Sequence, residues 1–222
     1  MKISLFEKLR GLEGKELWLL IGAAAVLVLL SVLFFRKRSL PETEHPAEQT
    51  KPRALVYGAF CLTLSFLLSY FKLFSMPFGG SVTLLSMMPL MMYASCFGPK
   101  RGFAAAFAYS LLQIVQGAWI VHPVQFVLDY LVAFTCLGLP SLIPDRLTAG
   151  CALGGFARML VSTVSGAVFF SDSGMEYGIL NPWVFSLLYN FLTIGIETLL
   201  CIGASFIPGI RKIRDLMRKA SV

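Results

Sequence analysis

The most constraining feature of this sequence is a series of seven apolar stretches separated by short polar or basic segments. A helix needs about 20 mostly apolar residues to cross the hydrocarbon core of a bilayer. The first stretch covers residues 17–35, and a block of six follows. Its members are residues 54–74, 82–97, 102–121, 126–143, 148–170 and 183–207. The pattern predicts an all-α integral membrane protein, in which one extra N-terminal transmembrane helix precedes a six-helix bundle.

The low content of charged residues supports a membrane location. Of the 222 residues, 57% are hydrophobic and only 14% are charged, whereas about a quarter of the residues in a soluble domain are charged. A soluble enzyme or a nucleic-acid-binding protein with so few charges could not cover its surface, so both classes are excluded. The formal net charge of +7 is attributed to membrane topology, and we expect no nucleic-acid partner.

The distribution of basic residues orients the six-helix block. Alternation from the basic C-terminal tail places three connecting segments outside, and none of them contains Lys or Arg; they are residues 75–81, 122–125 and 171–182. Every segment placed inside contains at least one basic residue, as the positive-inside rule requires. We therefore expect both ends of the block in the cytoplasm. The predicted organisation is an N-terminal segment (1–38), a polar linker (39–53), the membrane domain (54–210) and a basic cytoplasmic tail (211–222).

The first helix fits this rule less well. Its basic flank at residues 36–38 belongs inside, which forces residues 1–16, with four Lys or Arg, to the outside. A cleaved signal peptide is one interpretation. A retained anchor helix is favoured, because the stretch is long for a signal peptide and no A-x-A-like cleavage site follows it.

The sequence contains no motif for metal binding or for chemistry. The five cysteines all lie in apolar stretches without a C-x-x-C pair, and the two histidines are far apart, so we expect neither a metal site nor a cofactor. There is no G-x-x-x-x-G-K-[ST] loop, so the chain is not expected to hydrolyse ATP itself. No catalytic constellation is visible, which disfavours an intramembrane enzyme.

Three ionisable residues lie well inside the apolar stretches: Asp129, Arg158 and Glu197. Lys72 lies near the end of its stretch and can reach the membrane interface. Such residues are costly in lipid and normally face a protein interior or a water-filled cavity. One interpretation is purely structural, with Asp129 and Arg158 as a buried ion pair that holds helices together. For Arg158 and Glu197 this structural role is favoured.

Asp129 is interpreted differently, because other polar and aromatic residues share its predicted depth near the outer surface. Gln125 lies on the same helical face four residues earlier, and Trp183, Tyr189 and Asn190 lie at a similar depth on the last helix. A carboxylate, two amides and aromatic rings at one depth predict a pocket for a small polar ligand that is cationic or bears an amine.

Four segments carry a family resemblance. They are MPFGGSVT (residues 76–83), HPVQFVLDYLVAF (122–134), SGAVFF (165–170) and SLLYN (186–190). In this order they resemble the thiamine-specific substrate-binding (S) component of energy-coupling factor (ECF) transporters, over residues 54–207. Each segment alone is weakly specific, but four of them in register within six predicted spans make a strong signal.

The resemblance implies a six-helix protein of the prokaryotic plasma membrane that captures thiamine from outside. It also implies partner subunits, namely a membrane scaffold (the T component) and two cytoplasmic ATPases. Asp129 and Asn190 occupy positions that contact thiamine in the family, and Ala59 and Thr63 occupy the small-residue positions that dock on the scaffold. The full set of expected substrate-binding residues is Asp129, Asn190, Gln125, Tyr189, Ser162, Gly166, Phe185, Trp183 and Gly80.

The chain departs from the family pattern at two of these positions. Ser162 stands where the family usually has His, and Phe185 stands where it usually has Tyr. Loss of two polar groups would weaken the binding of thiamine or favour a relative such as a pyrimidine precursor. The alternative to transport is a structural or regulatory membrane protein built on the same fold, with the N-terminal helix recruiting a partner.

Overall fold

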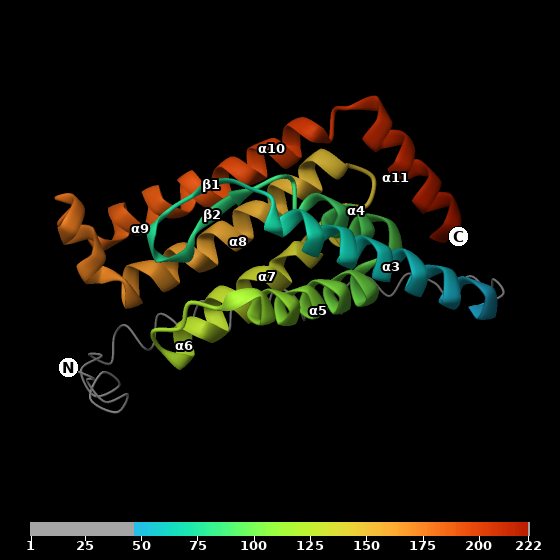
Figure 1. Ribbon diagram of the computed structural model, residues 1–222. Coiled ribbons are helices and arrows are strands. Elements are labelled where there is room, and N and C mark those ends of the chain that lie inside the picture. Colours follow the sequence, from blue (N-terminus) through green and yellow to red (C-terminus); the bar gives the residue numbers. More distant parts are fainter. Residues whose placement is uncertain (1–46, 222) are drawn as a thin grey trace. The chain divides into compact units, whose positions relative to one another are not determined.

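The computed structural model describes residues 47–221, which are mostly helical (Figure 1). The helix predicted at residues 17–35 lies outside this range, as does most of the linker predicted at residues 39–53. Helix α3 begins at Ala47, so the last part of that predicted linker is helical. Within residues 47–221, four spans are long and apolar enough to cross a membrane; they are Pro52–Tyr70, Pro123–Leu142, Leu147–Phe169 and Pro182–Ala204.

The elements follow the predicted order of spans. The separate helices are α3 (Ala47–Tyr70), α4 (Met88–Phe97), α5 (Pro99–Gly117), α8 (Leu147–Phe169) and α11 (Pro208–Ser221). Two spans are composite, and both contain a π-helical segment. The first comprises α6 (Pro123–Phe126), π-helical η2 (Val127–Val132), α7 (Ala133–Thr135) and 3-10 helix η3 (Cys136–Leu142); the second comprises α9 (Pro182–Asn190), π-helical η5 (Phe191–Gly195) and α10 (Ile196–Ala204).

Proline and N-capping side chains explain where several helices begin. A proline occupies the first turn of α4, α5, α6 and α9, where the missing N–H is not needed and the fixed φ favours the helix. His122 caps α6 by accepting a hydrogen bond from the Val124 N–H at Nδ1 (3.1 Å). Asn181 caps α9 by accepting from the Trp183 and Val184 N–H groups. Local sequence therefore sets the outer ends of both composite spans.

The short helix α4 is the most deeply buried element of the bundle. All its residues except Cys96 are buried, and Leu90 and Met91 have no exposed surface. Methionine fills irregular space well because its side chain is unbranched and flexible. The helix within the stretch predicted as a span at residues 82–97 is thus a ten-residue helix in the protein core, and it begins only at Met88.

A small antiparallel hairpin lies between α3 and α4. It consists of β1 (Lys72–Ser75), the 3-10 turn η1 (Pro77–Gly79) and β2 (Ser81–Thr83), with Phe74 opposite Val82. Phe78 and Gly79 both have positive φ, at 60° and 86°, and this conformation reverses the chain. The apolar stretches predicted at residues 54–74 and 82–97 therefore contribute their adjoining ends to strands, which the all-helical prediction missed.

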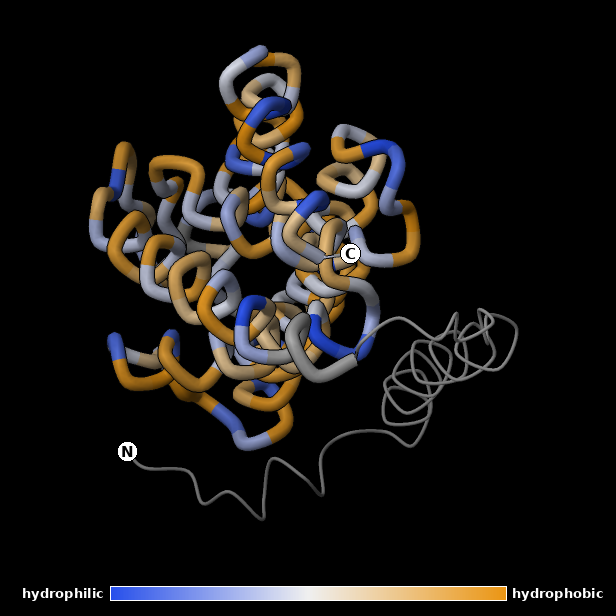
Figure 2. Tube along the Cα trace, turned by 90° about the vertical axis from the view of Figure 1, so that its right-hand side faces the viewer, coloured by the Kyte–Doolittle hydropathy of each residue, from blue (hydrophilic) through white to orange (hydrophobic). Residues whose placement is uncertain are grey.

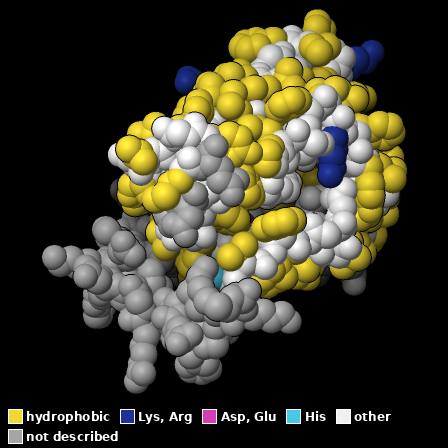
Figure 3. Space-filling view, turned by 60° about the vertical axis from the view of Figure 1, so that its left-hand side comes forward, with side chains coloured by type: hydrophobic (Ala, Val, Ile, Leu, Met, Phe, Trp, Pro, Cys, Tyr) yellow, Lys and Arg dark blue, Asp and Glu magenta, His cyan; other side chains and the backbone are white. Residues whose placement is uncertain are grey.

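The C-terminal residues form α11, which Figure 1 shows crossing the end of the bundle where α10 finishes. This segment was predicted only as a basic tail. Figure 2 views the molecule from that side, and the helices carry hydrophobic residues around much of their circumference. Figure 3 shows another face that is mostly hydrophobic with isolated Lys or Arg side chains. Such surfaces are expected of helices in contact with lipid.

Candidate functional site

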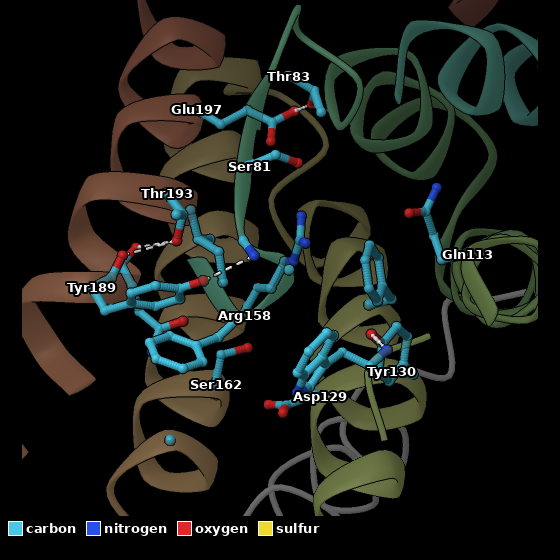
Figure 4. A pocket seen from close by; sticks show the side chains of 18 of the residues that line it. Ser81, Thr83, Gln113, Asp129, Tyr130, Arg158, Ser162, Tyr189, Thr193 and Glu197 are labelled. Atoms are coloured by element: carbon cyan, nitrogen blue, oxygen red, sulfur yellow. Dashed lines mark hydrogen bonds between the residues drawn. The ribbon is translucent and has the colours of Figure 1, made fainter. Parts of the chain in front are cut away.

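A polar cavity of about 240 Å³ lies between the hairpin, α5 and the spans that contain Asp129, Arg158 and Asn190 (Figure 4). It is next to the segments predicted to be outside, and α11 lies at the other end of the bundle. Eight of the nine residues expected from sequence to bind substrate line it. They are Gly80, Gln125, Asp129, Ser162, Gly166, Phe185, Tyr189 and Asn190.

Trp183 is the expected residue that does not line this cavity. It is the second residue of α9, and its side chain is 51% exposed. Seven residues of helix separate it from Asn190, which corresponds to about 10 Å along the axis. Trp183 therefore does not share the depth of Asn190, and its exposed side chain is not part of the cavity wall.

Gln125 holds the carboxylate of Asp129 in place. Its amide nitrogen donates to Asp129 Oδ2 (2.8 Å) and to the carbonyl oxygen of Trp119 (3.1 Å), while its amide oxygen accepts from the Val121 N–H (3.1 Å). Gln125 is only 2% exposed. Both donor hydrogens are thus used within the protein, so Gln125 orients Asp129 and the preceding loop.

Asn190 lies across the cavity, where α9 approaches α8 closely. Its amide nitrogen donates to the carbonyl oxygen of Ser186 (2.9 Å), and the Ser186 hydroxyl donates to the carbonyl oxygen of Thr163 (2.7 Å). A Cβ at Gly166 would collide with Ser186 Oγ. Glycine at this position therefore lets α8 and α9 pack closely beside the cavity.

Asp129 and Asn190 are both associated with irregular helix geometry. Asp129 lies within π-helical η2, and η5 begins immediately after Asn190. A π-helical turn contains an extra residue, which changes the direction of the side chains around it, and such turns are frequent at functional sites. Two independent elements thus have this geometry at the walls of one cavity.

Tyr189 links the hairpin to α9. Its hydroxyl accepts a hydrogen bond from the Gly80 N–H (2.8 Å) and donates to the carbonyl oxygen of Pro77. A Cβ at Gly80 would collide with this hydroxyl, so glycine is needed for the close approach. The Phe78 ring lies 6.4 Å from the rings of Tyr189 and Phe170, which gives the outer part of the cavity an aromatic wall.

Arg158 also lines the cavity, but the buried ion pair considered from sequence is not formed. Within the described range the ion pairs are Arg214–Asp215 and Arg218–Asp145. Arg158 Cζ lies 4.0 Å from the centroid of the Phe134 ring, and its Nε is buried without a hydrogen-bond partner among the described residues. The guanidinium is therefore held by a cation–π contact and by packing.

Glu197 lies deeper, where it connects α10 to the hairpin. It is 3% exposed, and its Oε1 accepts hydrogen bonds from the hydroxyls of Thr83 (2.5 Å) and Ser86 (2.7 Å). Two hydroxyl donors stabilise a buried carboxylate that would otherwise be costly. This contact agrees with the structural role favoured for Glu197, although the residue also lines the cavity.

Sequence reasoning missed the wall supplied by α3 and α5. Ser69, Gln113 and Gln116 line the cavity and form a small network, in which Gln113 Nε2 donates to Ser69 Oγ (3.2 Å) and Ser69 Oγ donates to Gln116 Oε1 (3.0 Å). Two glutamines three residues apart in an apolar helix lie on one face. The spacing of these two glutamines in the sequence could therefore have indicated that α5 contributes a polar wall to the cavity.

The remaining expected residues lie elsewhere. Ala59 and Thr63 are exposed on the outer face of α3, away from the bundle core.

Among residues 47–221, no three His, Cys, Asp or Glu side chains are grouped so that they could hold a metal ion. The chemistry available in the cavity is thus charge pairing, hydrogen bonding and aromatic contact.

Comparison with known proteins agrees with this architecture. A solved structure of ThiT from Listeria monocytogenes superposes with a TM-score of 0.57 and 19% sequence identity, covering 75% of this chain and 93% of that chain. This match confirms the predominantly helical membrane fold. The thiamine transporter ThiT of Bacillus subtilis (strain 168) is 31% identical over 134 residues, which cover 52% of this chain and 68% of the relative.

The match to a protein family covers most of the chain. Residues 55–216 match the family described as thiamine transporter protein (Thia_YuaJ), and this range includes every expected substrate-binding residue. The resemblance found in the four sequence segments is therefore confirmed, and the chain belongs to the thiamine transporter family.

Proposed function

We propose that this chain is the substrate-binding component of a membrane importer and that it captures thiamine, or a close relative, from outside. The observation that carries the proposal is the polar cavity near the outer end of the bundle, with the Asp129 carboxylate at its wall. The known family members are transporters, and the chain is a multi-pass transport protein of the cell membrane, not an enzyme.

The cavity suits a ligand that combines a positive charge with aromatic rings. Asp129 offers a carboxylate oxygen for a charge-assisted hydrogen bond to a cation or an amine. The rings of Phe78, Phe170 and Tyr130 line the same space and can stack on a flat ligand or face a cation. Thiamine has both features, since it carries a thiazolium cation and an aminopyrimidine ring.

Two residues of the cavity wall bear on the choice between thiamine and a relative. Ser162 lines the cavity with a short hydroxyl, and Phe185 lines it with a ring that has no polar group. A larger polar side chain at either position would reach further into the cavity. The cavity is therefore compatible with weaker thiamine binding or with a pyrimidine precursor.

Energy for uptake is proposed to come from partner subunits. The sequence has no phosphate-binding loop, so in this proposal separate ATPases supply the energy for accumulation against a gradient, and they act through a membrane scaffold. Ala59 and Thr63 lie four residues apart on the exposed face of α3. Small residues at this spacing allow another helix to approach closely in a membrane, and we assign this face to the scaffold.

Tryptophan fluorescence tests ligand binding directly. Trp119 lines the cavity, whereas Trp183 does not. Titration of the purified full chain with thiamine should quench fluorescence, and Trp119→Phe should remove most of the quench while Trp183→Phe retains it. A saturable quench that survives Trp119→Phe would place the ligand elsewhere, and calorimetry without a binding isotherm for thiamine or its pyrimidine precursor would contradict the proposal.

A further inference from the structure

Helix α11 is firmly attached to the cytoplasmic end of the bundle. Met217 is 4% exposed and belongs to the hydrophobic core. Arg218 forms an ion pair of 2.7 Å with Asp145 in the loop before α8, and the Arg214 carbonyl oxygen lies 3.6 Å from Cys96 Sγ on α4. The last part of the chain is therefore a docked helix at the end opposite the cavity.

A second face of α11 is exposed and combines apolar with basic side chains. Ile213 is 50% exposed and Leu216 is 56% exposed. Lys212 and Lys219 lie four residues before and three residues after Leu216, so they flank it on the same side of the helix. We call Lys212, Ile213, Leu216 and Lys219 the basic-apolar face.

The charge on this face is not neutralised within the described part of the protein. Helix α11 contains five Lys or Arg residues and one acidic residue, Asp215. Arg218 pairs with Asp145 and Arg214 pairs with Asp215. Arg211, Lys212 and Lys219 form no ion pair with a described residue. Three cations therefore remain, and two of them, Lys212 and Lys219, lie beside the exposed apolar side chains of the basic-apolar face.

The position of α11 brings this face to the level of the membrane surface. The preceding span ends at Ala204, and Phe206 and Ile207 in the connecting turn are 57% and 52% exposed. Figure 1 shows α11 turning away from the axis of α10 and crossing the end of the bundle. A helix that leaves a span in this way runs at the interface, where apolar side chains enter the acyl region and lysines reach the headgroups.

We propose that α11 is an interfacial helix that binds anionic phospholipids of the cytoplasmic leaflet through its basic-apolar face. Lys212 and Lys219 pair with lipid phosphates, and Ile213 and Leu216 insert between the acyl chains. Charge complementarity identifies the occupant as anionic lipid, because the cytoplasmic leaflet attracts basic segments next to the membrane. Because α11 directly follows the last membrane span in the chain, its basic-apolar face lies at that leaflet without the help of another protein.

Hydrogen exchange of the full chain in nanodiscs tests this proposal. Lipid bound to folded α11 slows opening of the helix and hence exchange of its amides. Amides of α11 should exchange at least about fivefold more slowly in phosphatidylcholine discs containing phosphatidylglycerol than in pure phosphatidylcholine discs. Each lysine near an anionic membrane surface increases the binding constant for that surface by up to about fivefold. The double change Lys212→Gln with Lys219→Gln should therefore remove most of this difference in exchange rate.

The matched control is Lys100→Gln, an exposed lysine at the same end of the bundle but on α5. It should leave the difference between the two lipids unchanged, and high salt should abolish the difference in the wild type. Equal exchange in both lipids would overturn the proposal. It would also be overturned if only added cytoplasmic ATPase subunits protected α11, since the face would then bind protein. Circular dichroism of each variant establishes that the bundle remains folded.

Discussion

Replacement of Asp129 by Asn tests the proposed substrate site most directly. The change removes the negative charge but keeps the size of the side chain and an oxygen that can accept from Gln125 Nε2, which lies 2.8 Å from Asp129 Oδ2 in the wild type. No ion pair joins Asp129 to another described residue. The bundle should therefore fold normally, and the effect should fall on the ligand.

The expected loss of affinity follows from the charge that is removed. A hydrogen bond to a charged group contributes about 1.5–3 kcal/mol, against about 1 kcal/mol for a neutral one. The amide introduced by Asp129→Asn keeps a neutral acceptor, so the difference in binding free energy is about 0.5–2 kcal/mol. This corresponds to about 2- to 30-fold weaker binding of a cationic ligand.

Isothermal titration of the purified chain in detergent measures this loss. The matched control is Asp145→Asn, which also removes one carboxylate but lies at the end of the bundle opposite the cavity, in the ion pair with Arg218. It should leave the affinity unchanged. An uncharged pyrimidine precursor of thiamine provides a second comparison, because Asp129→Asn should weaken its binding less than that of the thiamine cation.

Unchanged thiamine affinity in Asp129→Asn would remove Asp129 from the site and refute the electrostatic argument. An equal loss for thiamine and for the uncharged precursor would show that the residue acts on the shape of the cavity and not through its charge. Loss of the folded state would appear in the melting temperature, which separates it from both outcomes.

Three further changes test other parts of the site and its coupling to transport. Ser162→His together with Phe185→Tyr should tighten thiamine binding in the same titration, because polar groups return to the cavity wall; weaker binding of every thiamine relative would contradict this. Gln125→Leu removes the group that orients Asp129 and should weaken thiamine binding about tenfold in calorimetry, whereas unchanged affinity would show that Asp129 needs no such support. Ala59→Leu with Thr63→Leu should retain binding in detergent but abolish vitamin uptake by cells that express the scaffold and ATPases, and loss of binding as well would show that these residues support the fold.

Much of the membrane fold and the cavity could be predicted because both depend on local patterns. Apolar stretches located the helices of the bundle, and polar residues within apolar spans, such as Asp129 and Asn190, marked the cavity. The polar segment at residues 75–81 was expected to connect two spans, and it forms the turn of the hairpin. These features can be predicted from one physical quantity, the free-energy cost of placing charged and polar groups in lipid.

Other features depend on three-dimensional contacts that a single sequence does not reveal. Trp183 was placed by approximate depth, and its exposed side chain is not part of the cavity wall. The strands β1 and β2 formed at the adjoining ends of two apolar stretches because they pair with each other, and hydropathy does not detect such pairing. An ion pair between Arg158 and Asp129 was considered from sequence, yet Arg158 packs against the Phe134 ring. The π-helical turn of η2, which changes the direction of the side chains around Asp129, was not predictable from sequence either.

The close packing of α8 against the last composite span has a consequence for how the cavity can change in size. A side chain at Gly155 would collide with Thr198, just as one at Gly166 would collide with Ser186. At these glycine positions the wall therefore cannot take a side chain without separating two helices. The opposite wall, from α3 and α5, is joined by hydrogen bonds among flexible side chains such as Gln113. Substitutions that adapt the protein to a larger or smaller ligand should therefore fall on α3 and α5, or on side chains that already face the cavity such as Ser162 and Phe185, while the α8 glycines stay fixed.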